Sequence, residues 1–253
     1  MRAPFAALLV AALAIAFPAF AGTKVESMTG DVRIGASPAT QGADIPSGTT
    51  LVLGPEAKAT LAFDDGMRIV LDRNTTFRVT DFSYAADDPL KDRAVFDLTR
   101  GAMRMVTGVL GKRSPQALAM RTRHATIQVR GTDYMMALIN PAYLEVLSGS
   151  IAAINGAGTV VFGQKAFGEI AAPDSLAVPA SESAVPPDAK GAFSRLREGL
   201  DPAAAVLPAD GSAAGAAAAA AAEPTSPAAA AILLGVGAAA IWVLTNPQST
   251  TSH

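Results

Sequence analysis

At residues 125–134 the chain reads Ala-Thr-Ile-Gln-Val-Arg-Gly-Thr-Asp-Tyr. Apolar and polar side chains alternate along this run as far as Arg130, which is typical of a strand with one buried and one solvated face. Gly131 suits a corner at which φ is positive or a side chain would clash. Thr132 and Asp133 can hydrogen-bond the backbone of that corner, and the Arg130 guanidinium can tie it to a carboxylate or carbonyl. The run therefore predicts a strand that ends in a structural turn rather than a ligand site.

Similar short runs of Val, Ile, Thr and Phe, separated by glycines, extend over residues 22–170. In the clearest case, residues 59–63 and 67–71 alternate on either side of Asp64-Asp65-Gly66, as in a hairpin. No amphipathic helix is evident in this region. We therefore predict an all-β domain of short strands in a solenoid-like or twisted sandwich arrangement. Strands are expected at 30–35, 50–53, 57–63, 67–71, 76–84, 94–99, 102–107, 124–130, 134–139, 143–147, 150–154, 159–163 and 166–171.

Residues 1–21 have the composition of a secretory signal peptide. Arg2 supplies the positive start, residues 5–17 the apolar run, and Ala19 and Ala21 the small residues before the cut. An uncleaved N-terminal anchor is the alternative, although the apolar run is short for a membrane-spanning helix of about 20 residues. We expect an exported, periplasmic protein.

After residue 170 the composition changes. Residues 171–227 are rich in Pro and Ala and are expected to form a linker, a low-complexity spacer with one short helix near 189–200. Residues 228–244 are apolar and are a candidate transmembrane helix, followed by a polar tail at 245–253. Such a helix would span about 25 Å against a hydrocarbon core of about 30 Å, so a tail helix that contacts another protein surface is the alternative.

Composition excludes several kinds of chemistry. The chain has no cysteine, which rules out disulfides, thiol catalysis and a lipoprotein anchor. Its formal net charge of −2 gives no reason to expect nucleic acid as a partner. We find no catalytic, cofactor-binding or metal-binding motif, and we expect the paired acids Asp64-Asp65 and Asp87-Asp88 to hydrogen-bond their own turns. The protein is therefore predicted not to be an enzyme.

One charge pattern suggests a partner surface. No acidic residue occurs between Asp97 and Asp133, and this interval is rich in cations. The interval could form a face that meets an acidic envelope protein or cell-wall polymer. Alternatively, its cations occupy outward positions on half-buried strands and are balanced by acids on other strands. The candidate partner-binding residues are Arg100, Arg104, Lys112, Arg113, Arg121 and Arg123.

Several segments, taken in order, resemble the FecR domain family. They are Gly30-Asp31-Val32, the hairpin from Ala59 to Leu71, Asn74-Thr75 with Phe77, Phe96-Asp97-Leu98, Gly101-Ala102-Met103-Arg104, Ala125 to Tyr134, and Val146 to Ile151. The resemblance covers roughly residues 25–165 and rests on the order and spacing of these segments together. The run Arg130-Gly131-Thr132-Asp133 lies within the part that resembles the family signature.

The resemblance implies an extracytoplasmic all-β domain of stacked short strands. In well-known family members the domain receives a signal from an outer-membrane transporter and relays it through one membrane helix to a cytoplasmic anti-sigma segment. This chain departs from that plan, because a signal peptide stands where the cytoplasmic segment would be. We therefore expect an exported domain that binds or senses an envelope partner and is tethered to the inner membrane by its C-terminal helix. The alternatives are a structural or surface-assembly module and a signal-transduction component that acts with separate regulators.

Overall fold

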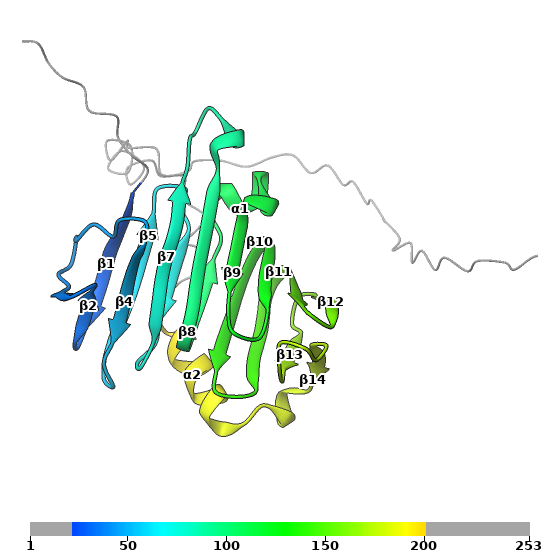
Figure 1. Cartoon of the computed structure of the whole chain (residues 1–253). Helices are drawn as coiled ribbons and strands as arrows, with labels where there is room; N and C mark the ends of the chain where they lie inside the picture. Colours follow the sequence, from blue (N-terminus) through cyan, green and yellow to red (C-terminus); the bar gives the residue numbers. More distant parts are fainter. Residues whose placement is uncertain (1–21, 201–253) are drawn as a thin grey trace, which may run out of the picture. The chain divides into compact units, whose positions relative to one another are not determined.

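The computed structural model describes residues 22–200 (Figure 1). Their strands form one fourteen-stranded sheet. The strands are β1 (Thr23–Thr29), β2 (Val32–Ile34), β3 (Ser37–Pro38), β4 (Thr49–Leu53), β5 (Lys58–Phe63), β6 (Arg68–Leu71), β7 (Thr76–Ser83), β8 (Arg93–Val106), β9 (Leu118–Arg121), β10 (Thr126–Leu138), β11 (Ala142–Asn155), β12 (Gly158–Phe162), β13 (Phe167–Ile170) and β14 (Val178–Ala180). The helices are α1 (Val109–Arg113) and α2 (Pro187–Arg197), with 3₁₀ turns η1 (Pro89–Lys91), η2 (Pro115–Ala117) and η3 (Glu182–Ala184).

The sheet folds over itself into two layers. Layer A has the strand order β3-β2-β4-β7-β8-β9-β10-β11-β12, and layer B has the order β1-β5-β6-β8-β10-β11-β13-β14. Strands β8, β10 and β11 belong to both layers. Residues 93–100 of β8 pair with β7 and β9 in layer A, whereas residues 101–106 pair with β6 and β10 in layer B. The domain is therefore all-β, as the sequence predicts.

The long strands cross between the layers at glycines. The bends fall at Gly101 in β8, Gly131 in β10 and Gly149 in β11, with φ of 89°, 55° and 76°. At Gly101 a Cβ atom would lie 2.5 Å from the Thr75 Cα, so only glycine fits. The sequence prediction of six short strands in these regions was wrong: each pair is one long strand that bends at its glycine instead of ending there.

The main core lies between the two layers. It includes the inward-facing side chains of the predicted 57–71 hairpin, which is confirmed as β5 and β6 with Leu61 opposite Ile69. The Phe63 ring packs edge-on against Phe82 and Phe96, with centroids 4.9 Å and 5.3 Å apart. Aromatic pairs of this geometry add stabilisation to the burial of their surface.

A second, smaller core lies on the outer face of layer B, where α2 covers the sheet. The helix buries Ala189, Ala192, Phe193 and Leu196 against side chains from β6, β8, β10 and β11. The segment expected as a linker from residue 171 thus contains β14, which pairs with β13, and α2, which lies where the short helix near 189–200 was expected. The folded unit continues past residue 170 because these spaced apolar residues find a hydrophobic surface to cover. The expected signal peptide, the rest of the linker, the candidate transmembrane helix and the polar tail lie outside the described residues.

Candidate functional site

The outer face of layer A carries a row of charged and polar residues across neighbouring strands. Thr50 in β4 lies opposite Arg78 in β7, Arg78 lies opposite Asp97 in β8, and Asp97 lies opposite Arg121 in β9. The row continues from Arg121 to Thr126 in β10. Because directly opposite residues point to the same side of a sheet, these side chains share one face.

A groove of about 470 Å³ follows this row. Three arginines, Arg78, Arg121 and Arg123, line it together with one carboxylate, Asp97, and several threonines. All three arginines are exposed. Asp97 accepts a hydrogen bond from the Thr80 hydroxyl, whereas none of the three guanidinium groups has a hydrogen-bond or ion-pair partner within residues 22–200. The groove is therefore net positive and has free donors for an anionic ligand.

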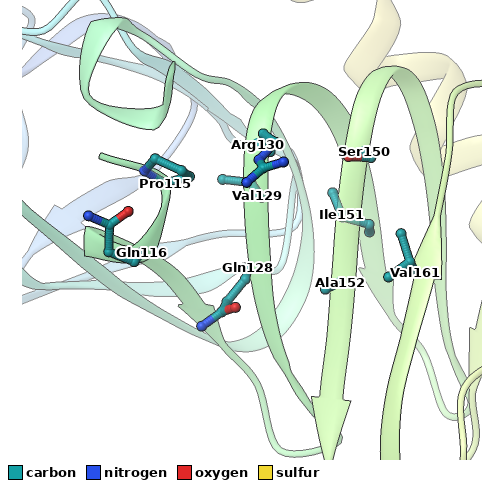
Figure 2. Close-up of a pocket in the computed structure, with 9 residues that line it drawn as sticks. All are labelled: Pro115, Gln116, Gln128, Val129, Arg130, Ser150, Ile151, Ala152 and Val161. Carbon is teal, nitrogen blue, oxygen red and sulfur yellow. The ribbon is translucent and has the colours of Figure 1, made fainter. Parts of the chain in front are cut away.

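A second depression, of about 340 Å³, lies beside the groove on the same face. Figure 2 shows how Gln116, Gln128 and Arg130 border it on one side and Ser150, Ala152 and Val161 on the other. Gln128 and Arg130 are outward positions of β10, and Val161 belongs to β12 at the edge of the layer. This depression adds amide groups and a fourth exposed guanidinium to the face.

Two of the six predicted partner-binding cations have internal roles, and Arg104 is the more buried. Its side chain is 3% exposed and lies under α2. Arg104 donates to both carboxylate oxygens of Asp133, with Nε–Oδ1 and Nη2–Oδ2 distances of 2.9 Å and 2.8 Å. Its Nη1 donates to the carbonyl oxygens of Arg197 and Leu200 at the end of α2. Arg104 is therefore removed from the partner surface, because its donors are used to hold α2 on layer B.

Arg113 is the second internal cation. It donates to both oxygens of Asp92 at 2.8 Å and 2.7 Å, and its guanidinium lies 4.6 Å from the centre of the Tyr84 ring. Burial alone would raise the pKa of Asp92, but hydrogen bonds from Arg113 and Ser114 outweigh it and lower the pKa. Arg113 thus fastens the 84–92 loop to α1 and is also removed from the partner surface.

The four remaining predicted cations are exposed, but they do not form one patch. Arg121 and Arg123 line the layer A groove. Arg100 borders a separate cavity of about 400 Å³ between α2 and layer B. Lys112, on α1, lies near the corner at Gly131. Only Arg121 and Arg123 therefore share a site.

The run Arg130-Gly131-Thr132-Asp133 lies at the corner where β10 bends, and its hydrogen bonds come mainly from Thr132. The Thr132 hydroxyl donates to the Ser150 carbonyl at 2.7 Å and accepts from the Arg130 amide at 3.1 Å. The Thr132 amide donates to the Thr107 hydroxyl at 2.8 Å. Asp133 binds Arg104 rather than the backbone of the corner, and the Arg130 side chain faces the depression on layer A. The run joins β8, β10 and β11 where they change layers.

One acid of each pair, Asp65 and Asp88, hydrogen-bonds its own turn, whereas Asp64 accepts from the Gly22 amide. Asp65 accepts from the amides of Met67 at 3.0 Å and Leu110 at 3.2 Å, and Asp88 accepts from the Leu90 amide at 3.2 Å. Among the described residues no group of three or more His, Asp or Glu side chains could hold a metal ion. Within the same residues no helix is long and apolar enough to cross a membrane.

Residues 49–152 match the family model described as FecR protein. This part of the chain is a FecR domain. The match lies inside the region 25–165 on which the sequence resemblance rested, and it includes the layer A groove, β8, β10 and most of β11.

The chain also resembles two solved structures, each described as a candidate anti-sigma factor from Parabacteroides distasonis ATCC 8503, determined at 2.50 Å and 1.65 Å. The TM-scores are 0.43 and 0.42 at 13% and 12% sequence identity. Each comparison covers 53% of this chain and 59% of that chain, so the likeness leaves two fifths of the solved protein unmatched. No protein in the curated set matches the chain.

The sequence analysis missed Arg78 as a site residue. It precedes the acid-free interval along the chain, so an argument from linear charge could not include it. The alternation of Thr76, Arg78 and Thr80 in the predicted 76–84 strand was the available signal, because it places all three on the solvated face. Pairing of β7 with β8 then brings Arg78 to the groove.

Proposed function

We propose that the FecR domain is a non-enzymatic sensing module that binds an acidic segment of an envelope protein in the layer A groove. The observation that carries the proposal is the set of three exposed guanidinium groups, on Arg78, Arg121 and Arg123, which lack partners among the described residues. Carboxylates accept two parallel hydrogen bonds from a guanidinium, so an acidic peptide suits this groove. The FecR family assignment supports a role in signal transduction.

The two faces of the fold favour layer A as the recognition surface. The outer face of layer B is covered by α2, and the apolar side chains of the sheet under this helix are buried. On layer A the outward residues of β7, β8 and β9 have no covering element within residues 22–200. A partner could therefore reach the arginines of layer A without displacing any described part of the domain.

The absence of an enzymatic role is part of the proposal. The groove offers arginines, threonines and one carboxylate, Asp97, which already accepts from Thr80. General acid–base or nucleophilic catalysis requires an activated group with a positioned partner, which this donor set does not supply. The groove is suited to binding an anion rather than transforming one.

We also propose that the protein is exported and that cleavage after Ala21 leaves Gly22 as the mature N-terminus. The Gly22 nitrogen lies 2.5 Å from the Asp64 Oδ2 atom. Cleavage would turn this amide into an ammonium group and strengthen the contact with the carboxylate. Mass spectrometry of the protein from the periplasmic fraction should give a chain that begins at Gly22, and a chain that retains residue 1 would contradict cleavage. Inner-membrane tethering by residues 228–244 remains a proposal that carbonate extraction tests, since release of the protein would refute it.

Fluorescence anisotropy with a labelled oligoglutamate peptide tests the groove. Arg78→Glu/Arg121→Glu should weaken binding by about tenfold or more, which corresponds to about 1.4 kcal/mol. The matched control is Arg73→Glu/Lys190→Glu, which makes the same change in net charge at exposed positions outside layer A. Equal losses for both double variants would show a nonspecific charge effect and would reject the groove.

The competing proposal is a structural or surface-assembly module, in which the open face contacts a cell-wall polymer. The groove chemistry does not by itself distinguish a carboxylate-bearing peptide from an anionic polymer. A competition experiment separates the two, with purified cell-wall polymer and unlabelled peptide each used to displace the labelled peptide. If the polymer displaces the labelled peptide at a lower concentration than the unlabelled peptide does, the structural role is favoured.

A further inference from the structure

Strand β12 is an open edge of the sheet at the end of layer A (Figure 1). In the part of the chain that the structure describes, it pairs with β11 alone. Its sequence, Gly158-Thr-Val-Val-Phe162, contains neither a charge nor a proline and is rich in β-branched residues. Val161 is 67% exposed. Unprotected edges of this composition are ready templates for another strand.

The other three edges of the sheet are protected. β3 has two residues and ends in Pro38, and β14 has three residues with Pro179 at its centre. β1 presents Lys24 and Glu26 and has a bulge between Val25 and Ser27. Short length, proline, charge and bulges all oppose strand addition. The contrast indicates that β12 is left open for pairing.

We propose that a second copy of this chain pairs with β12 through its own β12, antiparallel and about a two-fold axis. An antiparallel strand edge is complementary to itself, so identical copies satisfy both sides of the interface. One register pairs all five residues of both strands, and it places Val160 opposite Val160 of the partner subunit. Thr159 then faces the partner's Val161, and no like charges meet along the strands.

Charges at the two ends of β12 favour the same register. Lys165 follows the strand and is exposed. Asp174 is exposed beside the other end, where the Gly156 amide donates to the carbonyl of Pro173 at 2.9 Å. Antiparallel pairing centred on Val160 places the end of β12, which Lys165 follows, beside the start of the partner's β12, which the turn at Asp174 flanks. Each Lys165 thus approaches the partner's Asp174, and two salt bridges can form.

The pairing would extend the recognition surface. Directly opposite residues of antiparallel strands point to the same side, so the outer faces of both layers A would form one continuous surface. Val161 would be covered by the partner's Thr159. The depression that Val161 borders in each copy would lie at the seam between the two copies. One arginine groove would lie on each side of this seam. The dimer therefore suits a partner that carries two acidic segments.

The contact is small, which predicts a weak and reversible dimer. Five paired residues bury far less than the roughly 1,200–2,000 Å² of a stable interface. We expect a dissociation constant of about 10–100 μM, in the range of transient contacts. A partner that engages both grooves would strengthen the dimer through effective concentration.

Sedimentation velocity of the full mature chain over a range of concentrations tests the proposal. Wild type should shift from monomer to dimer, and Lys165→Asp and Asp174→Lys should each weaken dimerisation by about threefold or more, as loss and reversal of two exposed ion pairs imply. The double variant Lys165→Asp/Asp174→Lys should restore the wild-type constant. Asp is chosen at position 165 because φ there is 64°, which Asp adopts more readily than Glu. Glu56→Lys, at an exposed turn between β4 and β5, is the control and should leave dimerisation unchanged.

Cross-linking fixes the register independently, because the chain contains no native cysteine. A mixture of Thr159→Cys and Val161→Cys chains should form a disulfide-linked dimer on oxidation, since opposite Cα atoms lie about 4.5–5.5 Å apart. Each variant alone should cross-link less. A monomer at every concentration, or a dimer that neither charge variant affects, would overturn the proposal; in the second case the interface lies elsewhere. These experiments do not involve the arginines of the groove. Failure of the dimer proposal would therefore not count against the proposed binding of acidic peptide in the groove.

Discussion

Arg104 and Asp133 form a buried ion pair with two hydrogen bonds, and the same guanidinium holds the carbonyl oxygens at the end of α2. The pair joins β8 and β10 in layer B, directly after both strands have bent between layers. Asp133 closes the Arg130-Gly131-Thr132-Asp133 run. That run therefore links the bend of the sheet to the docking of α2.

Removal of one partner of this pair should be costly. Arg104→Ala leaves the Asp133 carboxylate buried without a counterion and should lower the free energy of unfolding by about 3–5 kcal/mol. Arg121→Ala, on the exposed face, should change it by no more than about 0.5 kcal/mol. Urea unfolding followed by circular dichroism measures both, and equal small effects would show that the ion pair does not hold the layers.

The glycine bends allow a matched comparison. Gly101 and Gly42 both have positive φ, at 89° and 81°, but a Cβ atom at Gly101 would clash with Thr75, whereas at Gly42 it would meet open space. Gly42→Ala should therefore cost only about 1 kcal/mol of backbone strain. Gly101→Ala adds the clash and should cost about 3 kcal/mol or more. Thermal unfolding compares them, and similar melting temperatures would contradict the role of Gly101 as a required corner.

Docking of α2 should depend on Phe193, which is 1% exposed. Phe193→Ala should weaken the contact by about 3–5 kcal/mol and release the helix before the sheet unfolds. Limited trypsin digestion should then cut after Arg195 and Arg197 much faster than in wild type. The control is Ser194→Ala at the neighbouring exposed position, which should leave the cleavage rate nearly unchanged.

Asp65 should give the stability curve a defined pH dependence. Burial, partly offset by hydrogen bonds from the Met67 and Leu110 amides, raises the pKa of Asp65 from 3.8 to about 6. The fold thus binds this proton more tightly than the unfolded chain does. Its contribution to stability is complete below about pH 4 and is lost as pH rises through about 6.

Comparison with Asp65→Asn isolates that contribution. The amide variant loses a hydrogen bond at every pH, which shifts its curve by a constant amount. The free energy of unfolding of wild type, relative to the variant, should fall by about 2 kcal/mol between pH 4 and 7. Chemical denaturation at several pH values measures the difference, and a difference that does not change with pH would refute the raised pKa.

The sequence was informative where local pattern determines structure. The 57–71 hairpin follows from alternation and from Asp64-Asp65-Gly66, and its inward side chains are the expected ones. Gly101 was misread because a glycine with positive φ serves equally at the end of a strand and at a bend within one. Only the pairing of β8 with different strands in the two layers separates these cases.

The sequence predicted a short helix near residues 189–200 but not that this helix would pack on layer B. The Ala- and Pro-rich segment resembles a linker, yet Ala189, Ala192, Phe193 and Leu196 have the i, i+3, i+4, i+7 spacing of a buried helical face. Arg104 and Arg113 could not be separated from the exposed arginines by any local pattern. Their carboxylate partners, Asp133 and Asp92, lie 29 and 21 residues away along the chain.

The measurement that tests the recognition surface most directly is a titration of the isotope-labelled protein with oligoglutamate, observed at the arginine Nε–H signals by NMR. Arg78, Arg121 and Arg123 should shift together and saturate at one peptide concentration, because they line one groove. Arg104 and Arg113 should stay unchanged, since Asp133 and Asp92 already occupy their donors. Unchanged signals for the three groove arginines, with shifts at Arg73 or Arg100 instead, would contradict binding on layer A.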